Sequence, residues 1–530
     1  MPACRQSFLS AGRGVYKGEE MTSYTNPILP GFHPDPSVCR VGDTFYLVNS
    51  TFSYFPGVPI FMSRDLVHFR QIGNVLDREE NLPLGTCAVN NGIYAPTIRY
   101  HEGVFYVITT NIENGGNFYV TATDPAGPWS KPHWLPEAEG IDPSLFFDDD
   151  GRAYYCGTKG AADARFFGDN VIYLRELDLE RSCLFGEETI VWRGALKECE
   201  WPEGPHIYKI NGWYYCMNAE GGTGPDHAVT VCRSRALRGP YEGCKANPVL
   251  THRHMGGTAA VQCVGHADLV DDADGNWYGV CLAMRPVDGV SSLGRETFLA
   301  RVSFENDWPV FNPGLGMLEA SGTVSLKEYL VPGEPEKLDF TDKRLPYSVL
   351  TLRNPAPDMY SFPEEGGGIC LRTLPAALTE NASPAYLALR ETSLDFTLET
   401  VLSFSPGEKE EAGLTLLQNN EACLRFVLRL NSGRRVLAVI RTEHGNSEVL
   451  SEIPAPESDI LLRMKEERHT MHFLYGSGER GLKELPVTCD TCFLSTERAG
   501  GFVGNTLGIY ASANGAESRN RAVFHYLSLT

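Results

Sequence analysis

Short apolar and aromatic runs alternate with turn residues along the first 330 positions of the chain. Five of these runs follow a turn pair such as Gly42-Asp43 or Asn211-Gly212. Gly and Asn or Asp accept the backbone angles of a tight hairpin turn, so the pattern predicts five β-hairpins. Their second strands begin with Phe45-Tyr46-Leu47, Phe105-Tyr106-Val107, Tyr154-Tyr155, Trp213-Tyr214-Tyr215 and Trp277-Tyr278.

A second short element recurs roughly ten residues before each hairpin. Its copies start 60, 47, 62 and 62 residues apart. One such unit cannot bury both of its faces, whereas five around an axis can, so the repeat predicts a five-bladed β-propeller. Unrelated hairpins of a sandwich are the alternative. The copies are Asp35-Pro36-Ser37-Val38, Ala95-Pro96-Thr97-Ile98, Asp142-Pro143-Ser144-Leu145, Gly204-Pro205-His206-Ile207 and His266-Ala267-Asp268-Leu269.

The repeats end near Leu330, where a Pro-rich stretch, residues 331–335, indicates a linker. Further short strands follow, some alternating in polarity, as in 396–402, and some continuously apolar, as in 436–440. We therefore expect a propeller over residues 25–330 and a second all-β domain, a sandwich of jelly-roll or concanavalin-like type, over 335–530.

Residues 1–24 form an N-terminal extension in this division of the chain. Gly18-Glu19-Glu20 is what a purine-rich ribosome-binding site encodes, and Met21 follows directly. A mis-assigned start and an ordinary chain terminus both explain this segment.

The composition of the chain argues against some classes of binding partner. The 530 residues carry 46 basic and 67 acidic side chains, a net charge of −21, which argues against nucleic acid and anionic membranes as partners. No window approaches 18 continuous apolar residues, and the first twenty residues lack the apolar core of a signal peptide. The 15 cysteines are scattered, so we expect reduced thiols and a cytoplasmic protein.

The repeat alignment predicts which side chains meet at one mouth of the propeller axis: Asp35, Tyr94, Asp142, Glu203 and His266. Three carboxylates suit hydrolysis of a glycosidic bond. One must stay protonated, another must be ionised, and a third can raise the pKa of the first by repulsion. A calcium site is the alternative, because hard cations bind several oxygens.

Aromatic side chains near these motifs, including Trp201, Phe52 and Tyr54, either form a platform for a sugar ring or pack in the core.

An ordered set of motifs resembles glycoside hydrolase family 43 over about residues 25–320. The remaining chain resembles the C-terminal β-sandwich of its β-xylosidase-type members. The motifs are Asn26-Pro27-Ile28-Leu29-Pro30-Gly31-Phe32-His33-Pro34-Asp35-Pro36-Ser37, Ile93-Tyr94-Ala95-Pro96, Gly140-Ile141-Asp142-Pro143-Ser144, Glu203-Gly204-Pro205-His206, Gly265-His266-Ala267-Asp268-Leu269 and Leu293-Gly294-Arg295-Glu296-Thr297.

The resemblance implies an inverting mechanism. Asp35 would be the general base that activates water, and Glu203 the general acid that protonates the leaving group. Asp142 would orient Glu203 and tune its pKa. Inversion places the two working carboxyl groups roughly 6.5–9.5 Å apart, with a water between them.

The resemblance also implies substrate contacts. Arg295 would bind the first sugar, with Phe52 and Tyr94 as walls, although many relatives have Trp where Tyr94 stands. Phe502, in a loop of the second domain, would close the pocket. His266 lies under the pocket and in some relatives borders a divalent cation, often calcium, so it is a candidate metal ligand. A structural water is the alternative, and no cofactor is otherwise required.

These features favour an exo-acting β-xylosidase that releases xylose from xylo-oligosaccharides or arabinoxylan fragments. An α-L-arabinofuranosidase, or an enzyme with both activities, is the alternative within the family. A non-catalytic carbohydrate-binding propeller is the alternative outside it. Xylosidase-type relatives are often dimers or tetramers, so a homo-oligomer is also an expectation.

Overall fold

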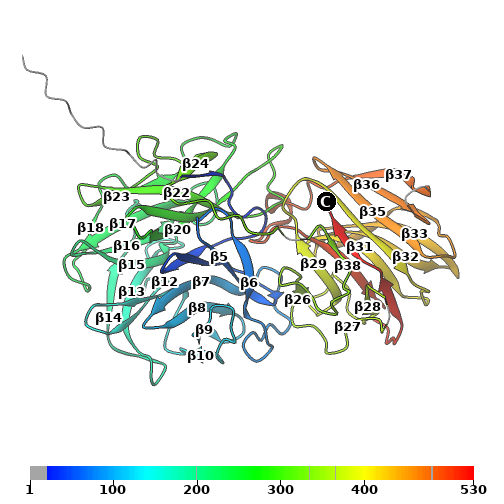
Figure 1. Cartoon of the computed structure of the whole chain (residues 1–530), viewed down its shortest axis with the longest axis horizontal. Helices are drawn as coiled ribbons and strands as arrows, with labels where there is room; N and C mark the ends of the chain where they lie inside the picture. Colours follow the sequence, from blue (N-terminus) through cyan, green and yellow to red (C-terminus); the bar gives the residue numbers. More distant parts are fainter. Residues whose placement is uncertain (1–20, 199, 334, 365, 479–480) are drawn as a thin grey trace, which may run out of the picture.

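The computed structural model describes residues 21–530 except 199, 334, 365, 479 and 480. Residues 1–20 of the expected N-terminal extension therefore lie outside the described part. The described chain is all-β, as expected, with a single short helix, α1 (Thr496–Ala499). It forms two units that lie side by side (Figure 1).

The first unit contains five antiparallel sheets, each built from strands that lie close together in the chain. The first two sheets along the chain are β2 (Ser37–Val41), β3 (Thr44–Val48), β5 (Gly57–Ser63) and β6 (Arg70–Leu76), and then β7 (Gly92–His101), β8 (Val104–Ile112), β9 (Gly116–Ala122) and β10 (His133–Trp134). The third sheet is β11 (Ile141–Phe147), β12 (Ala153–Gly160), β13 (Asn170–Asp178) and β14 (Cys183–Trp192), and the fourth is β15 (Glu203–Ile210), β16 (Trp213–Glu220), β17 (Ala228–Ser234) and β18 (Glu242–Gly243), with β19 (Leu250–Thr251) also paired with β17. The fifth sheet is β20 (Gln262–Asp271), β21 (Trp277–Met284), β22 (Glu296–Glu305) and β23 (Trp308–Phe311).

The first strands of the five sheets form a closed cycle. Strand β2 contacts β7, β7 contacts β11, β11 contacts β15, β15 contacts β20, and β20 contacts β2. Strand β1 (Thr22–Thr25) pairs with β24 (Ser321–Val324) and joins the two ends of this unit. Most residues of these first strands are buried, because each strand lies between two neighbouring sheets. We call the unit the ring.

The second unit is a pair of packed sheets that extends to the C-terminus. One sheet has the order β29 (Ala385–Arg390), β38 (Thr506–Ser512), β31 (Glu411–Asn419), β32 (Ala422–Asn431), β33 (Arg434–Glu443) and β34 (Asn446–Pro454). The other contains β27 (Tyr360–Ser361), β28 (Ile369–Arg372), β39 (Arg521–Phe524), β30 (Asp395–Ser403), β35 (Ile460–Glu467), β36 (Thr470–Gly476) and β37 (Lys483–Asp490), with β25 (Lys337–Leu338) and β40 (Leu527–Leu529) beside it.

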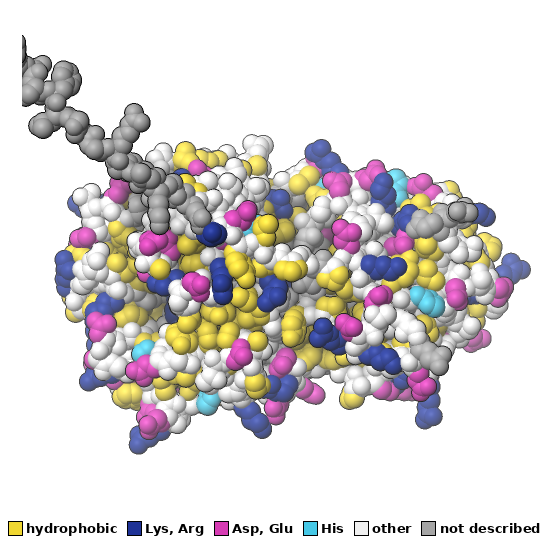
Figure 2. Space-filling model, in the orientation of Figure 1, with side chains coloured by type: hydrophobic (Ala, Val, Ile, Leu, Met, Phe, Trp, Pro, Cys, Tyr) yellow, Lys and Arg dark blue, Asp and Glu magenta, His cyan; other side chains and the backbone are white. Residues whose placement is uncertain are grey.

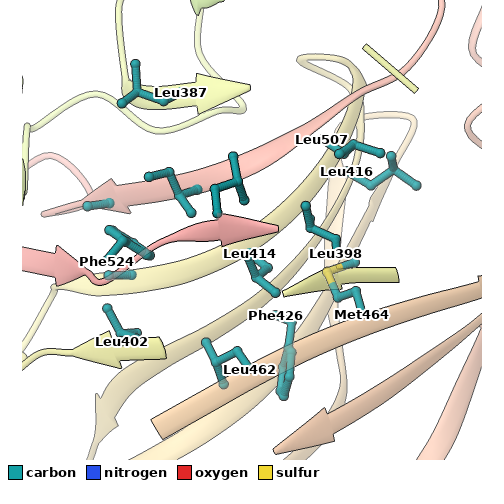
Figure 3. Packing of buried hydrophobic residues seen from close by; sticks show 14 of the residues in the cluster. Leu387, Leu398, Leu402, Leu414, Leu416, Phe426, Leu462, Met464, Leu507 and Phe524 are labelled. Atoms are coloured by element: carbon teal, nitrogen blue, oxygen red, sulfur yellow. The ribbon is translucent and has the colours of Figure 1, made fainter. Parts of the chain in front are cut away.

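A large apolar core fills the space between these two sheets. Figure 3 shows side chains of both sheets meeting there, among them Leu414 and Phe426 from one and Leu398 and Leu462 from the other. All four are fully buried. The core explains the alternating run 396–402, because β30 has only one face against it.

The first of the two sheets also buries its opposite face, against the ring. Leu417 and Tyr386 of this sheet cluster with Phe32, Phe52 and Tyr54 of the ring. Strand β26 (Thr351–Leu352) pairs with β4 (Tyr54–Phe55) across the same boundary. A strand buried on both faces needs apolar residues on both, which explains the continuous apolar run 436–440 of β33.

On the face shown in Figure 2, acidic and basic side chains are interspersed, and apolar atoms gather over the ring near β5 and β7. Among the described residues, none of the cysteines is in a disulfide. Within the same residues, no helix is long and apolar enough to cross a membrane.

Candidate active site

Five equivalent backbone positions surround the axis of the ring, one on the first strand of each sheet or just before it. All five have positive φ: Asp35 (52°), Ala95 (25°), Asp142 (54°), Gly204 (56°) and His266 (48°). Positive φ is rare for residues other than glycine, and such strain is concentrated at functional sites. The regular pairing of β7, β11, β15 and β20 with the next strand is also interrupted here. Such bulges re-aim side chains next to active sites.

One cavity opens at this point, with a volume of about 480 Å³ including its mouth. All eight candidate residues from the sequence line it: Asp35, Phe52, Tyr94, Asp142, Glu203, His266, Arg295 and Phe502. The structure therefore brings together residues that are up to 467 positions apart in the chain, from Asp35 to Phe502. Tyr54, by contrast, is fully buried in the apolar cluster between the two units.

Asp35 is held as a carboxylate. Arg295 Nη1 donates to Asp35 Oδ1 at 2.8 Å, and Ser50 Oγ donates to Oδ2 at 2.6 Å. Burial alone would raise the pKa of Asp35, but Arg295, His266 and the Ser50 hydrogen bond outweigh it, so its pKa lies below the usual value. Asp35 can therefore accept a proton from water near neutral pH.

Glu203 has the opposite environment. Burial, and then the negative charges of Asp142 and Asp35, raise its pKa well above the usual value. Burial also raises the pKa of Asp142, to about 6. The Gly204 N–H donates to Asp142 Oδ2 at 3.1 Å, which ties Asp142 to the residue that follows Glu203. The cavity thus holds one ionised carboxylate and one carboxyl group that keeps its proton.

A second polar layer lies behind the cavity, two to five residues farther along the same first strands. Arg99 Nη1 donates to Asp268 Oδ2 at 2.8 Å, and Arg99 Nη2 donates to His206 Nδ1 at 2.9 Å. Asp268 also accepts from Ser37 Oγ, at 2.6 Å, and from Tyr208 Oη. This buried ion pair fixes the first strands to one another beneath the carboxylates.

The segment that follows α1 in the second unit reaches over the ring. The Phe502 carbonyl accepts from Arg295 Nε and Nη2, at 3.4 and 3.3 Å. Asn90 Oδ1 accepts from the Phe502 N–H at 2.7 Å. The Phe502 ring stacks on Phe52, with centroids 6.2 Å apart, and meets Tyr94 edge-on at 6.2 Å. The cavity wall is therefore built from both units.

The comparisons with known proteins follow this division. Residues 24–309 match the model of glycosyl hydrolases family 43, and residues 337–530 match the beta xylosidase C-terminal concanavalin A-like domain. The chain belongs to glycosyl hydrolase family 43. The resemblance inferred from the motifs is thereby confirmed, and the protein is a glycoside hydrolase.

Several family 43 relatives span nearly the whole chain. A xylosidase/arabinosidase of Butyrivibrio fibrisolvens is 45% identical over 96% of this chain and 99% of its own length. A non-reducing end alpha-L-arabinofuranosidase of Bacteroides ovatus is 38% identical over 95% of this chain and 94% of its own length. The crystal structure of a xylan beta-1,4-xylosidase from Bacillus halodurans superposes with a TM-score of 0.89, at 34% identity, over 96% of this chain and 100% of that one.

The protein side chains around His266 do not by themselves supply the ligands of the calcium ion that the resemblance suggested there. Calcium takes six to eight oxygen ligands. The carboxylates beside His266 are Asp35, which is paired with Arg295, and Asp142, which accepts from Gly204. The described residues contain no group of three or more His, Cys, Asp or Glu side chains placed to hold a metal. We therefore derive no catalytic step through a cation.

Two polar residues of the cavity were missed by the sequence reasoning. Thr223 Oγ1 accepts from Arg295 Nη1 at 3.3 Å, and the side chain of His227, which also lines the cavity, is buried. Thr223 lies in the run Gly221-Gly222-Thr223-Gly224, a glycine-rich turn that could have signalled it. His227 does not lie at one of the repeated positions, so the sequence pattern gave no signal for it.

Proposed function

We propose that this family 43 protein is an inverting, exo-acting glycosidase that releases terminal xylose from xylo-oligosaccharides. The observation that carries the proposal is the pair of carboxyl groups with opposite pKa shifts in one cavity, Asp35 lowered and Glu203 raised. The closed cycle of first strands supports the reading of the five sheets as blades of a five-bladed propeller with this cavity on its axis.

Each side chain then has one task. Asp35 takes a proton from the attacking water, and Glu203 gives its proton to the glycosidic oxygen that departs. Asp142 raises the pKa of Glu203 and, through the Gly204 N–H, positions it. Arg295 keeps Asp35 ionised and lines the cavity, where sugar hydroxyls can accept from its guanidinium.

The residues that line the cavity support an exo mode of attack. They come from the five first strands near the axis of the ring, from residues next to these strands and, with Phe502, from the second unit. A pocket of this kind admits a chain end, whereas a continuous groove would admit the middle of a chain.

An α-L-arabinofuranosidase is the second candidate, because relatives carry the names xylosidase/arabinosidase and alpha-L-arabinofuranosidase. Initial rates on 4-nitrophenyl β-D-xylopyranoside and 4-nitrophenyl α-L-arabinofuranoside distinguish the two. We expect the xyloside to be hydrolysed with the higher kcat/KM. Proton NMR of the first sugar released tests inversion, since a β-xyloside must give α-xylose.

The roles of the two carboxyl groups predict different variants. Glu203→Ala should lower kcat on xylobiose by about 10²–10⁴-fold but lower it far less on the 4-nitrophenyl xyloside, because nitrophenolate leaves without a proton. Asp35→Ala should lower kcat on both substrates. Equal losses on both substrates in Glu203→Ala would contradict its role as the acid.

A further inference from the structure

Two aromatic side chains outside the cavity, Trp201 and Phe167, have no task in the mechanism above. We propose that they form a platform that binds the leaving-group sugar of an oligosaccharide substrate. This inference rests on the proposed function and adds to it the site that distinguishes a sugar leaving group from a small one.

The backbone conformation at Trp201 and the packing around its ring are unusual. Its backbone has a φ of 50°, and its N–H donates to the Gly168 carbonyl at 2.7 Å. Glycine lies against its ring at two places. A Cβ on Gly168 would come within 3.1 Å of Trp201 Nε1, and one on Gly222 within 2.7 Å of Cε3. Both glycines have positive φ, 75° and 65°. The strained backbone of Trp201 and the two glycines that make room for its ring indicate a constructed site.

Phe167 extends this site into solvent. It is 77% exposed, the highest value among the large hydrophobic side chains of the described residues. Its ring meets Trp201 edge-on, with centroids 5.3 Å apart and planes at 83°. Two aromatic rings at this angle form a corner that is open to solvent on one side. The C–H face of a sugar ring can pack into such a corner while its hydroxyls stay hydrated.

The position of the pair matches the direction of the reaction. Trp201 lies two residues before Glu203, and Gly222, which contacts its ring, directly precedes the cavity residue Thr223. Glu203 protonates the oxygen that belongs to the leaving group, so the leaving sugar must lie on the Glu203 side of the cavity. Neither Trp201 nor Phe167 lines the cavity itself. The terminal sugar and the leaving sugar therefore occupy separate sites.

The test measures kcat/KM of the wild type and of Phe167→Ala on two substrates that differ in their leaving group, xylobiose and methyl β-D-xylopyranoside. The exposed position leaves folding intact. We expect kcat/KM on xylobiose to fall about three- to tenfold, the value of one aromatic contact, and kcat/KM on the methyl xyloside to change less than twofold. Phe167→Trp should restore the rate on xylobiose. The matched control is Phe185→Ala, which removes another exposed phenylalanine, on β14.

Equal losses on both substrates, or an unchanged rate on xylobiose, would overturn the platform while leaving the proposed function standing. A wild-type protein that hydrolyses neither xyloside would instead contradict the xylosidase assignment, and the platform with it.

Discussion

The chemistry at the residue scale depends on giving three similar carboxyl groups different proton affinities. Asp35 and Asp142 are buried and Glu203 is half-buried, and desolvation alone would raise the pKa of each. Only Asp35 has a guanidinium at 2.8 Å and a hydroxyl donor on its other oxygen. The direction of its pKa shift is therefore reversed, and one chemical group can act as base beside another that acts as acid.

The pH dependence of the reaction follows from these directions. The base must be ionised, so kcat/KM should fall on the acid side as Asp35 becomes protonated. The acid must be protonated, so kcat/KM should fall on the alkaline side as Glu203 loses its proton. Asp142→Asn removes an anion that raises the pKa of Glu203 but keeps an acceptor for the Gly204 N–H. We expect the alkaline limb to move down by about one pH unit.

The measurement is kcat/KM on the xyloside across the pH range for wild type and Asp142→Asn. An alkaline limb that stays in place, or moves to higher pH, would show that Asp142 does not act on Glu203 through its charge.

The sequence could predict the carboxylates because they lie at equivalent positions of a repeat. Asp35, Asp142 and the Glu203-Gly204 pair each begin a copy, so an alignment of the chain with itself brings them together. Thr223 and His227 enter the cavity from the connection between β16 and β17, and the corresponding connections of the other sheets differ in length, so the repeat does not align these residues. The partner of Asp35, Arg295, was expected from family resemblance, because an ion pair over 260 positions leaves no local pattern.

At the scale of elements, polarity along each strand reports how many of its faces are buried. In β33, Leu437 and Val439 face the core of the second unit, while Ala438 and Ile440 face the ring. The apolar run 436–440 could therefore predict a strand. It could not predict which surface covers the second face, because any apolar surface satisfies the same pattern.

The segment that carries Phe502 is held at a fixed distance from the ring by glycine. A Cβ on Gly504 would lie 2.3 Å from the Leu293 carbonyl oxygen, two residues before Arg295. Gly504→Ala should push this segment away from the ring and weaken the contact of Phe502 with Arg295. We expect kcat/KM to fall about 10–100-fold, the cost of misplacing a site by about 1 Å.

Steady-state kinetics of Gly504→Ala and of Gly257→Ala test this expectation. Gly257 is the matched control, because no atom lies within 4 Å of a Cβ added there. Activity at the wild-type level in Gly504→Ala would show that the position of Phe502 does not matter for turnover.

At the scale of the whole molecule, the interface between the two units consists of buried side chains. Phe32, Phe52 and Tyr54 of the ring are almost fully buried against the second unit. Hydrogen bonds also cross this boundary. The Asn505 N–H donates to the Ser292 carbonyl at 3.1 Å, and Glu497 Oε2 accepts from the Ser291 N–H at 2.7 Å. The cavity wall that Phe502 supplies therefore depends on this boundary remaining closed.

Two buried glutamates of the second unit lie close to that boundary. Glu391 Oε2 accepts from Asn505 Nδ2 at 2.9 Å, and Glu466 accepts from the Thr491 hydroxyl. The second oxygen of each carboxyl group is buried without a hydrogen-bond partner. Burial raises the pKa of Glu466 to about 7, with Asp395 and Asp490 adding to it, although the Thr491 hydrogen bond acts against the rise. Burial and then Glu466 raise the pKa of Glu391 well above its usual value.

These shifts predict how stability depends on pH. Folded Glu466 keeps a proton that the unfolded chain releases above about pH 4.5, the ordinary value for glutamate. The stabilisation is complete below that pH and is lost as the pH rises to about 7. Glu466→Gln cannot ionise, so it should melt above wild type at pH 8, by about 1–4 °C, and close to wild type at pH 5. Thermal unfolding at both pH values is the measurement, with the exposed Glu457→Gln as control. A Glu466→Gln protein that melts below wild type at pH 8 would mean that the carboxylate is stabilising when charged, contrary to its buried position between acidic neighbours.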